Sequence, residues 1–130
     1  MKFRSTVLAA SLAFAALAFA AQASASCSYP KAPDRIPDGT KATKEEMLAG
    51  MKAMRAYNDL ITKYTECLQG EHDAAVAKID PSLAAEKKNA QKVELDNIQQ
   101  QKNDAAVADA EAVTGRFNDQ IKAFKAAHTS

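Results

Sequence analysis

Apolar side chains recur at steps of three and four residues in the first half of the chain. The series is Met47, Met51, Met54, Tyr57, Ile61, Tyr64 and Leu68. This spacing places them on one face of an α-helix and predicts a helix from Lys44 to about Ile79. Thr43, with Glu46 three residues later, is a capping-box start for that helix. Gly70 weakens it, so we expect the helix either to bend or to end there, with a shorter piece beyond.

A second helical region is predicted from Pro81 to about Ala127. Asp80 is the expected N-cap, with Pro81 as the first helical residue. Between the two ends of the region, residues 99–104 are polar on every face, so the pattern allows one helix or two, split near residues 101–104. Apolar stripes are expected at Leu83, Ala90 and Val93 near the start, and at Ala106, Ala110, Val113, Phe117, Ile121 and Phe124 near the end.

The two regions predict an all-α fold, a helical hairpin or small bundle with an N-terminal proline-rich extended arm. Pro30, Pro33 and Pro37 favour an extended backbone in that arm. The expected organisation is a signal peptide (residues 1–25), the arm (residues 26–42) and a helical hairpin domain (residues 43–130).

The first 25 residues have the pattern of a secretory signal peptide. Lys2 and Arg4 precede an apolar run from Val7 to Ala21, and Ala23-Ser24-Ala25 offers small side chains to a signal peptidase. Cleavage after Ala25 is expected, and cleavage after Ala23 is a near alternative. Two further alternatives are a retained membrane helix and a lipoprotein acylated at Cys27. The predicted location is periplasmic or secreted, with no transmembrane segment after cleavage.

Charge narrows the classes of partner. Lys2 and Arg4 are two of the 17 basic side chains, so the rest of the chain carries 15 basic and 16 acidic ones. This near balance gives no electrostatic reason to expect nucleic-acid binding or binding to anionic membranes. With no Trp and few Phe, the core is expected to be thin, and thin cores in small exported proteins are commonly reinforced by disulfides.

The two cysteines, Cys27 and Cys67, are therefore expected to form one disulfide. The arm is long enough to turn at Pro37-Asp38-Gly39 and return along the first helix to Cys67. Its proline rings would then pack on Tyr57 and Tyr64. The alternative is a loose tail that is held only at its end.

These residues also carry a resemblance. The order that carries it is Cys27, the prolines, Pro37-Asp38-Gly39, Ala42, Glu46-Met47, Tyr57-Asn58, Tyr64, Cys67-Leu68 and Glu71. In this order the chain resembles a group of small exported proteins of Gram-negative bacteria for which no activity is known. The resemblance covers about residues 27–71, and the second helical region carries none of it. It implies an exported, disulfide-bonded helical protein and no particular chemistry.

Candidate chemistry is sparse. His72, flanked by Glu71 and Asp73, is the one cluster that suggests a metal, but neighbouring helical residues point in different directions and His128 is distant in sequence. Two histidines and a cysteine expected to be oxidised make no catalytic triad, and the four glycines are too scattered for a phosphate loop. We expect no catalytic, metal or cofactor site, and a protein that is not an enzyme.

The remaining expectation concerns interaction. Met47, Met51 and Met54 are predicted to be core, although adaptable Met surfaces also bind partners. The apolar stripe from Phe117 to Phe124 can likewise be part of the core or a surface that binds a partner. The expected function is a non-enzymatic interaction or structural module that acts through helix faces, with an unknown protein partner or self-association. The alternatives are a self-assembling envelope protein and a small-ligand or metal carrier in the periplasm.

Overall fold

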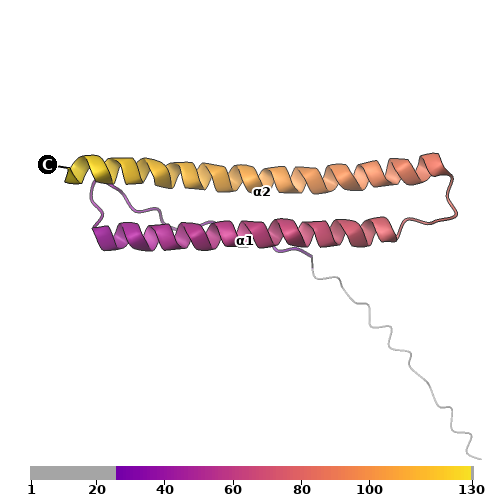
Figure 1. The fold of residues 1–130 in the computed structure, drawn as a ribbon, viewed down its shortest axis with the longest axis horizontal. Coiled ribbons are helices and arrows are strands. Elements are labelled where there is room, and N and C mark those ends of the chain that lie inside the picture. The colour runs from indigo at the N-terminus through magenta and orange to yellow at the C-terminus, as the bar shows by residue number, and fades with distance from the viewer. Residues whose placement is uncertain (1–25, 130) are drawn as a thin grey trace, which may run out of the picture.

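The computed structural model describes residues 26–129, and that part of the chain consists of two long helices, an extended arm and a connecting turn. Helix α1 (Lys44–Ala77) and helix α2 (Ala85–His128) lie side by side and run in opposite directions (Figure 1). The predicted all-α helical hairpin is therefore confirmed. Over this range, neither helix is long and apolar enough to cross a membrane. The predicted signal peptide, residues 1–25, lies outside the described residues.

Helix α1 begins as predicted and ends slightly earlier. The Thr43 hydroxyl accepts the Glu46 amide at 3.1 Å, and the Glu46 carboxylate accepts the Thr43 amide at 2.7 Å, which completes the capping box. The helix passes through Gly70 without a break. One glycine costs about 1 kcal/mol relative to Ala, and packing against α2 outweighs that cost. The C-cap is Lys78.

The predicted start of the second helix is wrong. Asp80 caps the connecting turn instead, because its carboxylate accepts the amide and the hydroxyl of Ser82 at 2.8 and 2.7 Å. Such a local bond offers the backbone an alternative to helix. Pro81 thus belongs to the turn, and α2 begins at Ala85 with Ala84 as an N-cap that makes no side-chain bond.

Helix α2 is continuous, so the single-helix alternative holds for residues 99–104. Gln99 explains part of this, since its amide donates to Gln69 of α1 at 2.8 Å and satisfies a polar side chain across the hairpin. The predicted stripe near the start of α2 is largely wrong. Ala90 is exposed and Val93 is 56% exposed, whereas Leu83 is half-buried. The helix turns Val93 away from α1 because its rotation is fixed by the stronger stripe further along.

The buried core lies in one half of the hairpin. We call residues 69–105 the distal half and the remaining described residues the proximal half. Met47 and Met54 are buried, as predicted, and Met51 packs against the core from its edge. The distal half contributes no buried side chain. The core consists of Ala42, Met47, Met54, Tyr57, Ile61, Tyr64, Leu68, Ala106, Val113 and Phe117.

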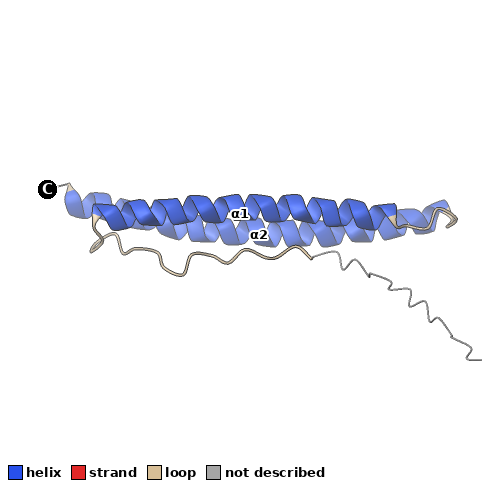
Figure 2. Ribbon diagram, turned by 90° about the horizontal axis from the view of Figure 1, so that it is seen from below, coloured by secondary structure: helices blue, strands red, loops and turns tan. Residues whose placement is uncertain are grey.

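The arm forms a third layer over the proximal half. It turns at Asp38, whose carbonyl accepts the amides of Lys41 and Ala42 at 3.0 and 2.7 Å. From there the chain runs back along one side of the helix pair (Figure 2). It reaches Cys67 of α1, where the two cysteine sulfurs lie 1.98 Å apart in a disulfide. The predicted path of the arm is therefore correct, and its turn lies about one residue later than expected.

Candidate functional site

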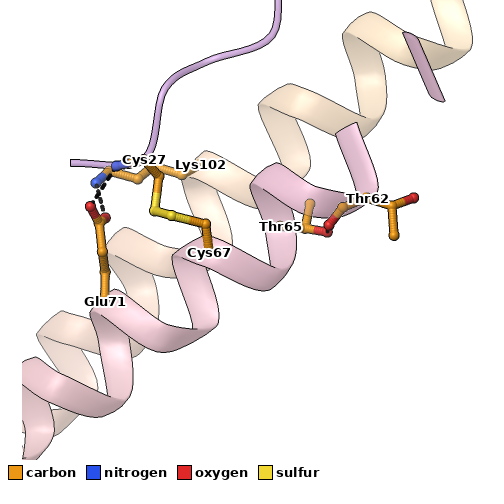
Figure 3. The surroundings of a disulfide bond; sticks show 6 residues. All are labelled: Cys27, Thr62, Thr65, Cys67, Glu71 and Lys102. Atoms are coloured by element: carbon orange, nitrogen blue, oxygen red, sulfur yellow. Dashed lines mark hydrogen bonds and ion pairs between the residues drawn. A yellow bond between two sulfur atoms is a disulfide. The ribbon is translucent and has the colours of Figure 1, made fainter. Parts of the chain in front are cut away.

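The end of the arm is held by a covalent bond and a polar pair. Next to the Cys27–Cys67 disulfide, the Cys27 amide donates to the Glu71 carboxylate at 2.8 Å (Figure 3). The other oxygen of that carboxylate lies 3.8 Å from Nζ of Lys102 on α2. Arm, α1 and α2 are thus joined at one level of the hairpin, at the boundary between its proximal and distal halves.

Tyr29 anchors the arm two residues further along. Its ring packs edge-on against Tyr64, with centroids 5.1 Å apart, and its hydroxyl donates to the Asp109 carboxylate at 2.5 Å. The hydrogen bond to Asp109, with partial burial, raises the pKa of Tyr29 to about 12. The hydroxyl therefore stays protonated at neutral pH and acts as a fixed donor. Proline rings were the predicted neighbours of Tyr57 and Tyr64. The ring beside Tyr64 is that of Tyr29, whereas Pro30 borders a hollow together with Tyr57.

Sequence reasoning missed Tyr29, although its position two residues after Cys27 was a usable signal. A disulfide fixes the start of the arm, so the next large side chain must lie near the same level of the helices. An aromatic ring there has more apolar area to bury than a proline, and its hydroxyl needs a partner. Asp109 provides that partner from α2.

The turn of the arm is docked through two glycines. The Gly39 amide donates to Oε1 of Gln120 at 2.9 Å, and a Cβ added at Gly39 would lie 1.9 Å from the Gln120 carbonyl oxygen. At Gly50 an added Cβ would lie 2.8 Å from the Phe117 ring and 2.9 Å from the Pro37 ring. Both glycines thus permit close approach between arm and helices.

A cleft of about 610 Å³ opens between the arm and the first turns of α1. Its walls are small or apolar, including Ile36, Pro37 and Ala53. Charged side chains also line it, namely Arg35, Asp38, Lys41 and Glu46, and the Glu46 carboxylate is occupied by the Thr43 amide. Asp38 is engaged by Thr40 and Lys41, whereas Arg35 makes no ion pair within residues 26–129. The cleft could therefore accept a small molecule with an apolar body and an anionic group.

The distal half is held together by polar bonds across the hairpin. His72, whose side chain is 11% exposed, lies 2.6 Å from the Asp96 carboxylate of α2 and 3.3 Å from that of Asp73. These carboxylates, Asp96 first, raise the pKa of His72. In turn, Lys92 and then His72 lower the pKa of Asp96. Gln69 and Gln99 add the neutral bond described above.

The cluster around His72 is thus a hydrogen-bonded network. Glu71 points to the arm, and Asp73 accepts the side-chain amide of Gln69 at 2.8 Å. Within residues 26–129 no group of three His, Cys, Asp or Glu side chains is arranged to hold a metal ion. His128 stacks on Phe124 near the end of α2, far from His72.

Beyond the end of the arm, a shallow groove runs between the two helices. Two adjoining hollows of about 160 and 320 Å³ share Ala75, Leu95 and Ile98 as lining residues. We call them together the distal groove. Ile98 is 43% exposed and Leu95 is half-buried, so the floor is apolar and reaches solvent.

The geometry thus offers a cleft beside the arm and an apolar groove beyond it. The resemblance to small exported proteins, drawn from residues 27–71, stays a prediction. Comparison of the chain with protein-family models, with curated proteins and with solved structures found no match.

Proposed function

We propose that this chain is an exported, non-enzymatic interaction module that binds a protein partner through the helix faces of its distal half. One observation carries the proposal. The buried core stops at Leu68 on α1 and resumes at Ala106 on α2, while both helices continue without a covering layer. In the proximal half the arm closes the core. In the distal half a partner would supply that third layer.

Export is supported by two independent features. Residues 1–25 have a basic start, an apolar run and a small-residue cleavage site. The Cys27–Cys67 disulfide favours an oxidising compartment such as the periplasm or the extracellular space. A chain of this size with a thin core gains most from such a covalent link where reducing systems are absent.

The proximal half acts as a rigid base for the distal half. The disulfide, the Tyr29–Asp109 bond and the Gly39–Gln120 bond fix the arm at three levels. A surface held in one conformation loses less entropy when it binds. Exposed apolar side chains on such a surface are typical of interaction sites.

Site-specific photocrosslinking in intact Gram-negative cells tests the proposal. A photoreactive residue at position 98 lies in the distal groove. Position 93 is a matched control, because Val93 is exposed on the same helix and lines neither hollow of the groove. We expect discrete higher-mass adducts from position 98 and few from position 93. Equal labelling from both positions, or none from position 98, would contradict the proposal. An adduct of twice the chain's own mass would favour the self-assembly alternative.

The cleft between arm and α1 favours a second candidate function, a small-ligand carrier. Its volume of about 610 Å³ falls within the range typical of small-molecule sites, and Arg35 is one of its lining residues. Native mass spectrometry of protein purified from its own compartment tests this. A retained mass that disappears in Arg35→Ala supports a carrier. A measured mass equal to that of the protein alone would rule out the carrier function.

A further inference from the structure

The groove between the helices continues past the arm on the same side of the hairpin. Glu71 accepts the Cys27 amide at the arm's end, and Ala75 and Lys78 follow it at steps of four and three. On α2, Ile98 and Leu95 precede Lys102 at the same steps. Residues at these steps share a helix face. Glu71 and Lys102 also line the first hollow of the distal groove. The distal groove therefore begins where the arm stops.

The two parts of this groove differ in what fills them. In the proximal half, Tyr29 and Ala32 of the arm border a small hollow together with Tyr57 of α1 and Val113 of α2, and both of these helix residues are buried. In the distal half the same strip is apolar and uncovered, with Ile98 43% exposed. The fold thus shows one occupied and one open stretch of a continuous surface.

We infer that the distal groove binds an extended apolar segment of a partner protein, laid end to end with the arm. The inference rests on the proposed interaction function and names the form of the partner. The first support is that the distal groove continues the surface on which the arm lies. In the proximal half that surface binds the arm, which is an extended chain whose Ala32 and Ile36 side chains pack on the core.

The polar side chains along the groove are the second support. An extended segment brings backbone amides and carbonyls that need partners, whereas a helix satisfies its own. The arm's amides at Cys27 and Gly39 are satisfied by side chains of the helices, Glu71 and Gln120. In the distal groove, Gln91 and Glu94 line the apolar floor, and their side-chain oxygens can accept such amides.

Length and charge define the segment further. The groove follows α1 from Glu71 to Ile79, about 12 Å at 1.5 Å per residue, which about four extended residues span. Lys78 and Glu94 line the groove with opposite charges. A segment with apolar side chains and little net charge therefore fits better than a strongly acidic or basic one.

A displayed library of random dodecapeptides, selected on the oxidised chain without residues 1–25, tests the inference. We expect enrichment of apolar sequences without helical periodicity, and affinity of the selected peptides at least tenfold weaker for Ile98→Asp and Leu95→Asp. Val93→Asp is the matched control and should leave affinity unchanged. Circular dichroism and thermal unfolding confirm that each variant is folded.

The selected peptides and the same variants also distinguish an extended segment from a helix or a second copy of the chain in the groove. The absence of enrichment, binding that Ile98→Asp does not weaken, or selected peptides that bind as helices by NMR would each overturn the inference. Concentration-dependent dimerisation abolished by Ile98→Asp in sedimentation would make a second copy the occupant and would also overturn it. If cellular crosslinks from position 98 persist while the peptides fail, the interaction function stands and the extended-segment inference alone falls.

Discussion

The Gly39 amide donates to the Gln120 side chain at 2.9 Å, and the backbones of the two residues are so close that a Cβ on Gly39 would lie 1.9 Å from the Gln120 carbonyl oxygen. The same Cβ would lie 2.8 Å from the Phe124 amide nitrogen. All of these neighbours are backbone atoms of α2, which cannot move without unwinding the helix. The turn of the arm therefore docks on α2 only because residue 39 has no side chain.

Gly39→Ala is expected to lift the turn away from α2. Overpacked core substitutions typically cost about 1–3 kcal/mol, and here the clash with backbone adds the loss of the Gly39–Gln120 hydrogen bond. We expect a loss of stability at the upper end of that range, measured as a lower urea midpoint with little change in its slope.

Gly70→Ala and Gly115→Ala are matched controls, since an added Cβ at either position meets nothing within 4 Å. Both glycines lie inside helices, where Ala is favoured by about 0.5–1 kcal/mol, so both variants should be more stable than the parent chain. If Gly39→Ala shifted the midpoint in the same direction as these controls, the close approach of arm and α2 would be wrong.

The disulfide should contribute a large share of the stability. It closes a sequence separation of 40 residues, for which the chain-entropy model gives about 4 kcal/mol. We expect Cys27→Ser with Cys67→Ser to lower the free energy of unfolding by about that amount. Denaturant titration with and without reductant measures it, and the reduced parent chain should match the double variant. Complete alkylation of Cys27 and Cys67 without reductant would show that the disulfide does not form.

Local signals in the sequence were sufficient for most of the fold. The capping box at Thr43 and the apolar steps of the first helix depend on residues three and four apart, so they place α1 without knowledge of the rest. The arm's return to Cys67 followed from chain length and one disulfide. The connecting turn was harder, because Asp80 can cap either a helix or a turn, and its bond to Ser82 decides between them.

The candidate site was less predictable because it depends on contacts between segments far apart in the sequence. Tyr29 meets Asp109 across 80 residues, and Gly39 meets Gln120 across 81. On α1 the core ends at Leu68, next to the Cys67 that holds the end of the arm, so the open groove beyond it was not visible from helix patterns alone. The polar stretch around Gln99 became interpretable only with Gln69 opposite it.

Alkaline titration should single out Tyr29 among the three tyrosines. Its pKa is raised from 10 to about 12, chiefly by the hydrogen bond to Asp109. Because the folded value exceeds the unfolded one, this contribution to stability is complete below pH 10 and is lost as pH rises toward 12. Burial also raises the pKa of Tyr57, so absorbance titration should show Tyr29 as the last tyrosine to ionise. Tyr29→Phe should remove that last step, and Asp109→Asn should move it to lower pH. A step near pH 12 that persists in Tyr29→Phe would show that another tyrosine carries the raised pKa.

The pair of His72 and Asp96 should make the link between the helices of the distal half dependent on pH. The pKa of His72 is raised by Asp96 and then Asp73, so its charged form is favoured in the folded state. The stabilisation is therefore complete below the ordinary histidine pKa of about 6.5, and it is lost as pH rises through the higher folded value. At the acid end the pair is lost as pH falls through the lowered pKa of Asp96, which Lys92 and His72 both depress.

Urea unfolding across this pH range should thus show a chain that gains stability as pH falls from alkaline values through the raised pKa of His72. His72→Gln and Asp96→Asn should each reduce the dependence of the unfolding free energy on pH. The double variant should reduce it no further than either single variant, because the two side chains act as a pair. Proton exchange of amides near residues 72 and 96 should slow over the same interval, beyond the intrinsic pH effect. Since α1 and α2 are otherwise joined here by Gln69–Gln99 and Glu71–Lys102, full loss of pairing at high pH is not expected. A pH profile unchanged in His72→Gln would show that this contact does not couple the two helices in solution.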